Sequence, residues 1–223
     1  MKPYYEHAGI TIYHGDCREV LPGMRADLLV TDPPYGLGSA RRKIMGFGDK
    51  RGKNGLGGAN PSRRDYGDSN WDDIRADDET IRLCMAVTRN QIIWGGNYFT
   101  LPPTKGVLVW DKLRGETDFA DGEMAWTSFD RALRIFRYRW NGFLVDSDSR
   151  DVRLHPTQKP LALMKWCIML NGTPANVLDA FAGSGTTLEA AKTIGIPAIG
   201  IEIEEKYCEI AARRLSQEVL DLQ

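Results

Sequence analysis

Apolar residues fall into short runs that alternate with amphipathic segments, which is the pattern of a parallel β-sheet with crossover helices. Six runs have strand length: Ile10–Tyr13, Asp27–Thr31, Gln91–Trp94, Gly106–Trp110, Asn176–Asp179 and Ala198–Ile203. Four segments have helical character: Thr80–Thr88, Leu161–Leu170, Thr187–Thr193 and Glu205–Leu220. No linker separates two cores, so the pattern predicts one α/β domain over residues 1–223.

The composition narrows the class of protein. Of the 223 residues, 42% are hydrophobic and 26% are charged, which is typical of a globular domain with its own core. No run approaches the ~20 apolar residues of a membrane span, and the N-terminus lacks the apolar core of a signal peptide. The four cysteines are scattered and form no Cys-x-x-Cys pair, which argues against a zinc site or a disulfide framework. We therefore expect a cytoplasmic protein with no metal and no membrane partner.

The segment Val177–Thr187 is an apolar strand that runs into a turn of small residues and then into a helix. Its glycines permit a tight turn and a close approach of the backbone to a ligand at the helix N-terminus. A phosphate-binding loop would end in a lysine, and none stands there. A dinucleotide-binding fold would place a third glycine at Leu188. A site for S-adenosylmethionine needs neither feature, because that ligand has no pyrophosphate.

Glu202 ends the next predicted strand. It follows the glycine turn at roughly the twenty-residue interval at which an acid reaches ribose hydroxyls in folds of this kind. The alternative is that Glu202 caps the terminal helix. We favour the ribose role.

The segment Asp27–Gly36 is the most specific signal in the chain. An apolar strand delivers Asp32-Pro33-Pro34-Tyr35 to the carboxyl edge of the sheet, where ligands bind in open α/β folds. An exocyclic amine of a base is a poor nucleophile, because its lone pair is delocalised into the ring. The Asp32 carboxylate and the Pro33 carbonyl would accept its two hydrogens and expose the lone pair, and Tyr35 would stack on a base flipped out of a duplex. The alternative is a rigid turn without a catalytic role.

Together these two motifs resemble those of the DNA amino-methyltransferases. The turn at Asp32 precedes the turn at Asp179, an order similar to that of the permuted β-group of these enzymes. Between them, the segment 155–160 (His-Pro-Thr-Gln-Lys-Pro) closely resembles a segment of that group that lines the methionine end of the cofactor. The segment 13–17 (Tyr-His-Gly-Asp-Cys) resembles the family element whose acid contacts the cofactor's adenine amino group, although Asp16 could instead be a helix N-cap.

The resemblance covers most of the chain and implies a fold, a cofactor and a set of sites. The implied fold is the Rossmann-like class I methyltransferase fold, with a mostly parallel seven-stranded sheet flanked by helices. The implied cofactor is S-adenosylmethionine, and the implied catalytic residues are Asp32, Pro33, Pro34 and Tyr35. The residues expected to bind the cofactor are Asp16, Cys17, Asp32, His155, Thr157, Lys159, Asp179, Phe181, Ala182, Gly183, Ser184, Gly185, Thr186, Thr187, Glu202 and Ile203.

A basic, glycine-rich segment at 36–70 follows the Asp32 turn directly. Between Leu37 and Arg64 it carries eight basic residues and one acid, in a chain whose formal net charge is −1. Charge runs are often only solvated surface, but the position beside the catalytic turn favours contact with the phosphates of double-stranded DNA. The residues we expect to bind DNA are Arg41, Arg42, Lys43, Lys50, Arg51 and Lys53. A small target-recognition region is expected at about 116–154, and a homodimer is a further expectation from the resemblance.

Adenine N6 is the expected target, because an acid at the head of the turn resembles the adenine enzymes, whereas serine is commoner in the cytosine-N4 enzymes. RNA and protein-glutamine methyltransferases usually place Asn before Pro-Pro-Tyr and have the cofactor motif first. A non-catalytic nucleic-acid-binding domain is a third alternative, against which the intact Asp32, Tyr35 and Gly183 argue.

Overall fold

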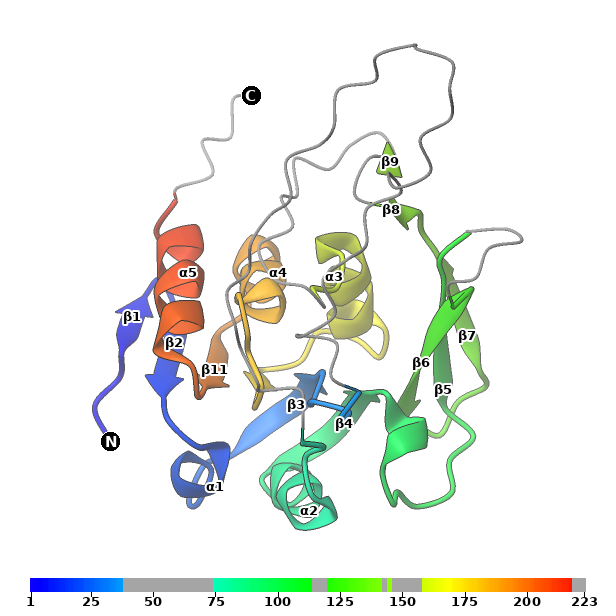
Figure 1. The fold of residues 1–223 in the computed structure, drawn as a ribbon, viewed down its shortest axis with the longest axis horizontal. Helices are drawn as coiled ribbons and strands as arrows, with labels where there is room; N and C mark the ends of the chain where they lie inside the picture. Colours follow the sequence, from blue (N-terminus) through cyan, green and yellow to red (C-terminus); the bar gives the residue numbers. More distant parts are fainter. Residues whose placement is uncertain (38–73, 114–119, 142–143, 146–157, 218–223) are drawn as a thin grey trace, which may run out of the picture.

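The computed structural model describes residues 1–37, 74–113, 120–141, 144–145 and 158–217. A nine-stranded mixed sheet forms the centre of this part of the chain (Figure 1). Its strands are β1 (Tyr5–His7), β2 (Ile10–His14), β3 (Ala26–Thr31), β4 (Thr88–Trp94), β5 (Val107–Asp111), β6 (Gly122–Thr127), β7 (Arg134–Arg137), β10 (Val177–Asp179) and β11 (Ala198–Glu202). Two further strands, β8 (Trp140–Asn141) and β9 (Leu144–Val145), pair with each other.

The strand order is β1-β2-β11-β10-β3-β4-β6-β5-β7. Strands β2, β11, β10, β3 and β4 are parallel to one another, so their carboxyl ends meet at one edge of the sheet. Strand β6 is antiparallel to both β4 and β5, and therefore begins at the edge where those two strands end.

The helices lie on both faces of the sheet, in two groups (Figure 1). Helices α3 (Leu161–Met169), α4 (Thr186–Ile194) and α5 (Glu205–Ser216) pack on one face, and α1 (Cys17–Val20) and α2 (Asp78–Ala86) pack on the other. Alternation along β3 produces both contacts, since Leu28 and Val30 face the first group while Leu29 faces the second. A short 3₁₀ helix, η1 (Gly96–Tyr98), follows β4. None of the described helices is long and apolar enough to span a membrane.

The sequence-based prediction of the fold class is confirmed, but the count of seven strands was too low for the described residues. The sequence pattern located six of the nine strands, and of the three others β1 and β7 lie at the edges of the sheet, where strands are short and half exposed. The prediction also missed β6, which inserts between β4 and β5. Both β6 and β7 lie within the segment 116–154, whose role in target recognition stays a prediction.

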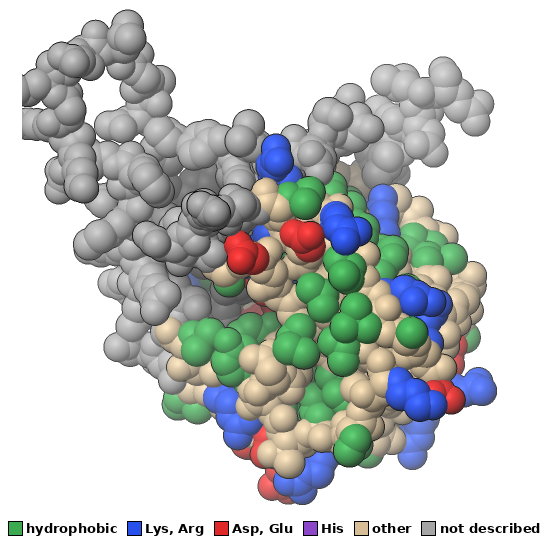
Figure 2. All heavy atoms as spheres, turned by 90° about the vertical axis from the view of Figure 1, so that its right-hand side faces the viewer, with side chains coloured by type: hydrophobic (Ala, Val, Ile, Leu, Met, Phe, Trp, Pro, Cys, Tyr) green, Lys and Arg blue, Asp and Glu red, His purple; other side chains and the backbone are tan. Residues whose placement is uncertain are grey.

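The β5–β6–β7 end of the sheet presents an open face to solvent. Figure 2 shows hydrophobic side chains grouped on this side of the molecule, with Lys and Arg side chains around them. Met124 and Ile135 are exposed and lie on either side of Val109 in the strand register. Among the described residues, no helix covers this end of the sheet as helices cover both faces of the parallel strands.

Candidate active site

Four acidic residues lie at one edge of the sheet because each follows, or ends, a parallel strand. Asp16 follows β2, Asp32 follows β3, Asp179 ends β10 and Glu202 ends β11. Strands β3 and β10 are neighbours, yet the chain leaves β3 through α2 on one face and leaves β10 through α4 on the other. This is a topological switch point, the position at which open α/β sheets bind ligands.

The Asp32–Tyr35 turn is held by hydrogen bonds and by the stacking of its aromatic ring. The Tyr35 hydroxyl donates a hydrogen bond to Asp32 Oδ1, and the Ala76 N–H donates to the Pro34 carbonyl over 3.0 Å. The Tyr35 ring is stacked on that of Tyr98, with centroids 4.8 Å apart and planes 18° from parallel. One face of Tyr35 is therefore covered by a residue that follows β4.

Gly95 makes room for the Tyr35 ring. Its φ is +64°, a conformation that side chains rarely adopt, and a Cβ at this position would lie 2.1 Å from Tyr35 Cε1. The glycine after β4 thus allows the aromatic residue of the neighbouring strand's turn to lie across the end of β4.

Asp32 is held by a buried lysine. Lys159 Nζ lies 2.5 Å from Asp32 Oδ2 and 3.0 Å from Glu123 Oε2, and its side chain is 5% exposed. Burial raises the pKa of Asp32, and the Lys159 ammonium limits that rise. Burial alone would lower the pKa of Lys159, but Asp32 and Glu123 raise it above its ordinary value. Lys159 is therefore cationic, and its charge favours the carboxylate form of Asp32.

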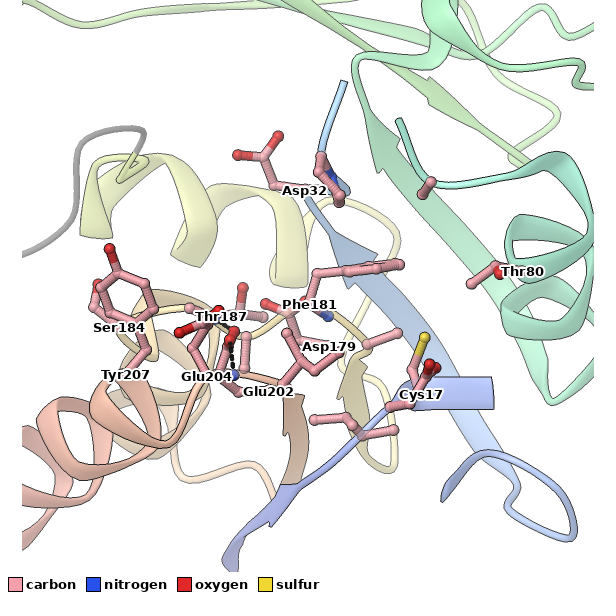
Figure 3. A pocket seen from close by; sticks show the side chains of 18 of the residues that line it. Cys17, Asp32, Thr80, Asp179, Phe181, Ser184, Thr187, Glu202, Glu204 and Tyr207 are labelled. Atoms are coloured by element: carbon pink, nitrogen blue, oxygen red, sulfur yellow. Dashed lines mark hydrogen bonds between the residues drawn. The ribbon is translucent and has the colours of Figure 1, made fainter. Parts of the chain in front are cut away.

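A cavity of about 490 Å³ extends from Asp32 across the ends of β10, β11 and β2. Figure 3 shows the side chains of Asp32, Asp179, Phe181 and Glu202 gathered around this space. The volume lies within the ~300–1,000 Å³ of small-molecule sites. The cavity is wide enough for a nucleoside-sized ligand, and its charged lining is mostly acidic.

Asp179 lies at the centre of the cavity wall. Its Oδ1 accepts hydrogen bonds from the Thr31 hydroxyl over 2.8 Å and from the Phe181 N–H over 3.1 Å. Burial raises the pKa of Asp179 to about 6. The described donors to this carboxylate are neutral groups, so its ionised form is less strongly favoured than that of a carboxylate beside a lysine.

Glu202 holds the glycine-rich turn. Its Oε2 accepts from the Gly183 N–H over 2.7 Å, and its Oε1 accepts from the Glu204 N–H over 2.8 Å. Burial raises the pKa of Glu202 to about 7. The turn itself needs Gly185, whose φ is +80° and whose absent Cβ would lie 2.9 Å from Ala211 Cβ on α5. Glu202 thus shapes the cavity as well as facing it.

Asp16 is the N-cap of α1, with Oδ1 accepting from the Arg18 N–H over 2.9 Å. It also forms an ion pair with Arg18 at 2.5 Å, and that hydrogen-bonded pair lowers the pKa of Asp16. The capping role that the sequence left open is therefore present. The carboxylate lines the cavity at the same time.

Most of the residues expected to bind the cofactor surround this single cavity. Those that line it are Asp16, Cys17, Asp32, Lys159, Asp179, Phe181, Ala182, Gly183, Ser184, Thr186, Thr187, Glu202 and Ile203. Gly185 is not among the lining residues, but it supports the turn. His155 and Thr157 lie outside the described residues, as do Arg41, Arg42, Lys43, Lys50, Arg51 and Lys53. The roles of all these residues stay predictions.

Several residues of the site were not among the site residues predicted from the sequence. Thr80 and Tyr207 line the cavity, Tyr98 covers Tyr35, and Glu123 contacts Lys159. Thr80 and Tyr207 lie on helices whose patterns indicate only one buried face. Glu123 lies near the start of a strand that the sequence did not predict. The signal for Tyr98 was the pair of glycines before it, which marks a close approach of backbone to another group.

The DNA methylase family model N6_N4_Mtase matches residues 108–213, from β5 to α5. The type II methyltransferase M2.LlaDCHI of Lactococcus lactis subsp. cremoris is 26% identical over 264 residues, an alignment that covers 97% of this chain and 93% of that protein. This alignment includes the Asp32 turn, which precedes the residues matched by the family model.

Two solved structures share the fold. The M1.HpyAVI complex with S-adenosylmethionine has a TM-score of 0.53 and 23% identity, covering 92% of this chain and 99% of that one. The cytosine-N4-specific PvuII DNA methyltransferase has a TM-score of 0.58 and 15% identity, covering 99% of this chain and 91% of that one. Both likenesses extend over nearly the whole chain.

Proposed function

We propose that this chain, a DNA amino-methyltransferase by its relatives and its fold, methylates adenine N6 at a specific site in double-stranded DNA. The observation that supports this best is the Asp32–Tyr35 turn, whose residues Asp32 and Pro34 line the cavity and whose Asp32 is held by Lys159. The relative M2.LlaDCHI is named a type II methyltransferase, and we infer that this chain has the same kind of role in restriction-modification.

S-adenosylmethionine fits the residues of the cavity. Its sulfonium supplies an activated methyl group, and its positive charge suits a cavity lined by Asp16, Asp179 and Glu202. The Glu202 carboxylate has accepted two backbone N–H groups and retains lone pairs for a ribose hydroxyl. Asp16 can accept from an amino group, and Phe181 offers an apolar surface to an adenine ring.

The residues of the Asp32 turn would activate the target amine. Asp32 accepts one amine hydrogen, which draws the nitrogen lone pair out of conjugation with the ring, and it then receives the proton that the methylated amine must lose. Burial raises the pKa of the Tyr35 hydroxyl, so Tyr35 stays protonated and donates to Asp32 Oδ1. No covalent intermediate with the protein is needed, so positioning and electrostatics carry the catalysis.

A flipped base would stack on Tyr35. Because Tyr98 covers one face of that ring, the base must use the other face or displace Tyr98. Stacking on an aromatic side chain is how enzymes that act on extruded bases hold them.

We propose adenine rather than cytosine because Asp32 is an acid, as in the adenine enzymes that this turn resembles. Cytosine N4 is the alternative, since the same acceptors could hold its exocyclic amine. Incubation of the protein with methyl-labelled S-adenosylmethionine and mixed-sequence duplex DNA, followed by nucleoside analysis, tests the proposal. We expect label in N6-methyladenine. Label in N4-methylcytosine would support the alternative, and label in RNA or protein but not in DNA would contradict both.

The DNA contacts are proposed for Arg41, Arg42 and Lys43, which follow the Asp32 turn in the sequence. Neutralising all three should weaken binding to every duplex sequence and reduce the salt dependence, by a slope of roughly 0.9 for each phosphate that is no longer neutralised. Fluorescence titrations at several salt concentrations measure both effects. An unchanged affinity and slope would mean that these residues do not contact DNA.

A further inference from the structure

Four charged side chains form a chain of alternating sign beside the Asp32 turn. Lys112 Nζ lies 2.5 Å from Glu123 Oε1, Glu123 Oε2 lies 3.0 Å from Lys159 Nζ, and Lys159 Nζ lies 2.5 Å from Asp32 Oδ2. Lys112 and Lys159 are both buried. The chain therefore consists of two ammonium and two carboxylate groups whose formal charges cancel.

The β5–β6 hairpin brings Lys112 and Glu123 to this place. Lys112 follows β5, and its N–H donates to the Asp121 carbonyl over 2.8 Å, which closes the hairpin. Glu123 is opposite Trp110 in the register, at the end of β6 that lies beside the carboxyl end of β4. Because β6 runs antiparallel to β4 and β5, its first residues, including Glu123, lie at the edge of the sheet where Asp32 lies.

We propose that Glu123 is a positioning residue for methyl transfer, which holds the Lys159 ammonium on the Asp32 carboxylate. Lys159 and Asp32 line the cavity, whereas Glu123 and Lys112 are not among its lining residues. Glu123 therefore acts on the reaction through Lys159. This inference rests on the proposed function, because it assumes that Asp32 receives a hydrogen of the target amine.

A buried lysine with one partner can rotate about its flexible stem, since the ammonium is a point charge with no fixed direction. A second carboxylate on the opposite side fixes two of its three N–H donors. Lys112 then compensates the charge of Glu123, and the two lysines lower the pKa of Glu123 to about 2 against the opposing effect of burial. Glu123 therefore remains an anion throughout the working pH range, as the role requires.

The groups around Asp32 give the pH dependence a sign. Burial and the negative charge of Glu123 raise the pKa of Asp32, while Lys159 and the Tyr35 hydroxyl lower it. Asp179 on β10 is the other nearby carboxyl group, and the negative charge of Asp32 contributes to its raised pKa. Without the Lys159 charge, the pKa of Asp32 must rise, so methyl transfer is lost at a higher pH. When Glu123 is removed, the direction in which the pKa of Asp32 changes depends on the position of Lys159. The pKa of Asp32 falls if Lys159 stays in place and rises if Lys159 moves away.

The test compares Glu123→Gln, Lys159→Met and the control Asp130→Asn. Asp130 pairs with Lys105 at 2.8 Å, but both side chains are largely exposed. Single-turnover methylation of duplex DNA is measured from pH 5 to 9, and the affinity for S-adenosylmethionine is measured by calorimetry. We expect Lys159→Met to move the acidic limb of the rate profile upward by about 1–3 pH units. Glu123→Gln should move it in the same direction by less, and should reduce the rate by up to about a hundredfold.

A rate and profile for Glu123→Gln equal to those of Asp130→Asn, or a shift of the acidic limb downward, would overturn the proposal. So would a loss of cofactor affinity that accounts for the whole loss of rate, because Lys159 would then act on the cofactor. Wild-type protein that methylates no DNA contradicts the proposed function instead, and this result is separate from those of the variants.

A double variant, Lys112→Met with Glu123→Gln, separates positioning from the stability of the hairpin. If Glu123→Gln is slow only because it leaves Lys112 without a compensating charge, the double variant regains the rate. The proposal predicts that it remains slow, since Lys159 still lacks its second carboxylate. This variant keeps the formal net charge of the wild type, and it serves in place of Glu123→Gln if the single variant does not fold.

Discussion

The buried carboxylates at the two ends of the cavity have partners of different charge. At the proposed cofactor end, the described partners of Asp179 and Glu202 are hydroxyl and backbone N–H groups, and burial raises their pKa values to about 6 and about 7. At the proposed catalytic end, Asp32 and Glu123 contact lysine ammonium groups. The pKa of Glu123 is lowered to about 2, while burial still raises the pKa of Asp32 and Lys159 limits that rise. The difference follows from the charge of the partner, because both ends are largely removed from water.

This difference fits two proposed roles, binding of a cationic cofactor and activation of a neutral amine. A carboxylate that must accept hydrogen bonds from a cationic ligand need not have a resident counter-ion, because the ligand completes its environment. A carboxylate that must accept a hydrogen from a neutral amine gains no counter-charge from that ligand, so a lysine stabilises its ionised form. We therefore expect changes at the cofactor end to alter affinity, and changes at the catalytic end to alter rate.

The largest effect is expected for Asp32→Asn, which keeps the shape of the side chain but removes its ability to receive a proton. The single-turnover rate of methyl transfer should fall by about 10²–10⁴-fold, the usual contribution of general acid–base groups. Nearly normal turnover would show that Asp32 does not act on the amine.

Gly95→Ala should have the next largest effect, because its Cβ would lie 2.1 Å from the Tyr35 ring. The displaced ring alters the catalytic turn, and the rate should fall by up to about a hundredfold. Gly23→Ala is the matched control. Gly23 has φ +86°, with nothing within 4 Å of the added Cβ, so this variant has the backbone strain without the collision. Equal rates for the two variants would refute the proposed role of Gly95.

Glu202→Gln should weaken binding of S-adenosylmethionine. A hydrogen bond to a charged group contributes about 1.5–3 kcal/mol, which is more than tenfold in affinity. The rate at saturating cofactor should change little. Calorimetry measures the affinity, and an unchanged value would remove Glu202 from the cofactor site.

The smallest expected effect is a gradual change of cofactor affinity and of protein stability with pH. Because the cofactor prefers ionised Glu202 and Asp179, its affinity should rise as the pH is raised through 6 and 7, by up to about tenfold per pH unit for each group. The stability of the cofactor-free protein should change in the opposite sense. A carboxyl group whose pKa is raised on folding costs stability as the pH rises from its unfolded value to its folded value, because the unfolded chain ionises first. Calorimetry and thermal unfolding from pH 5 to 8 test both trends, and Glu202→Gln should flatten each of them.

The sequence predicted which residues meet around Asp179 and Glu202 better than it predicted the partners of Asp32. Asp179 and Glu202 each close a parallel strand, and parallel strands of one sheet end at one edge, so local patterns were enough to bring them together. The partners of Asp32 depend on long-range pairing. Glu123 reaches Lys159 because β6 enters the sheet antiparallel between β4 and β5, and the short segment Gly122–Thr127 gave no periodicity that would predict this. Tyr98 similarly meets Tyr35 only after β4 and β3 have paired.

The most direct test of separate roles for the two ends of the cavity is the affinity of Asp32→Asn for S-adenosylmethionine. It is measured on the same preparation that shows the loss of rate. We expect the dissociation constant to stay within about threefold of the wild-type value, a difference in binding free energy of less than ~0.7 kcal/mol. A dissociation constant raised tenfold or more, with the rate at saturating cofactor largely retained, would contradict this expectation and would assign Asp32 to cofactor binding.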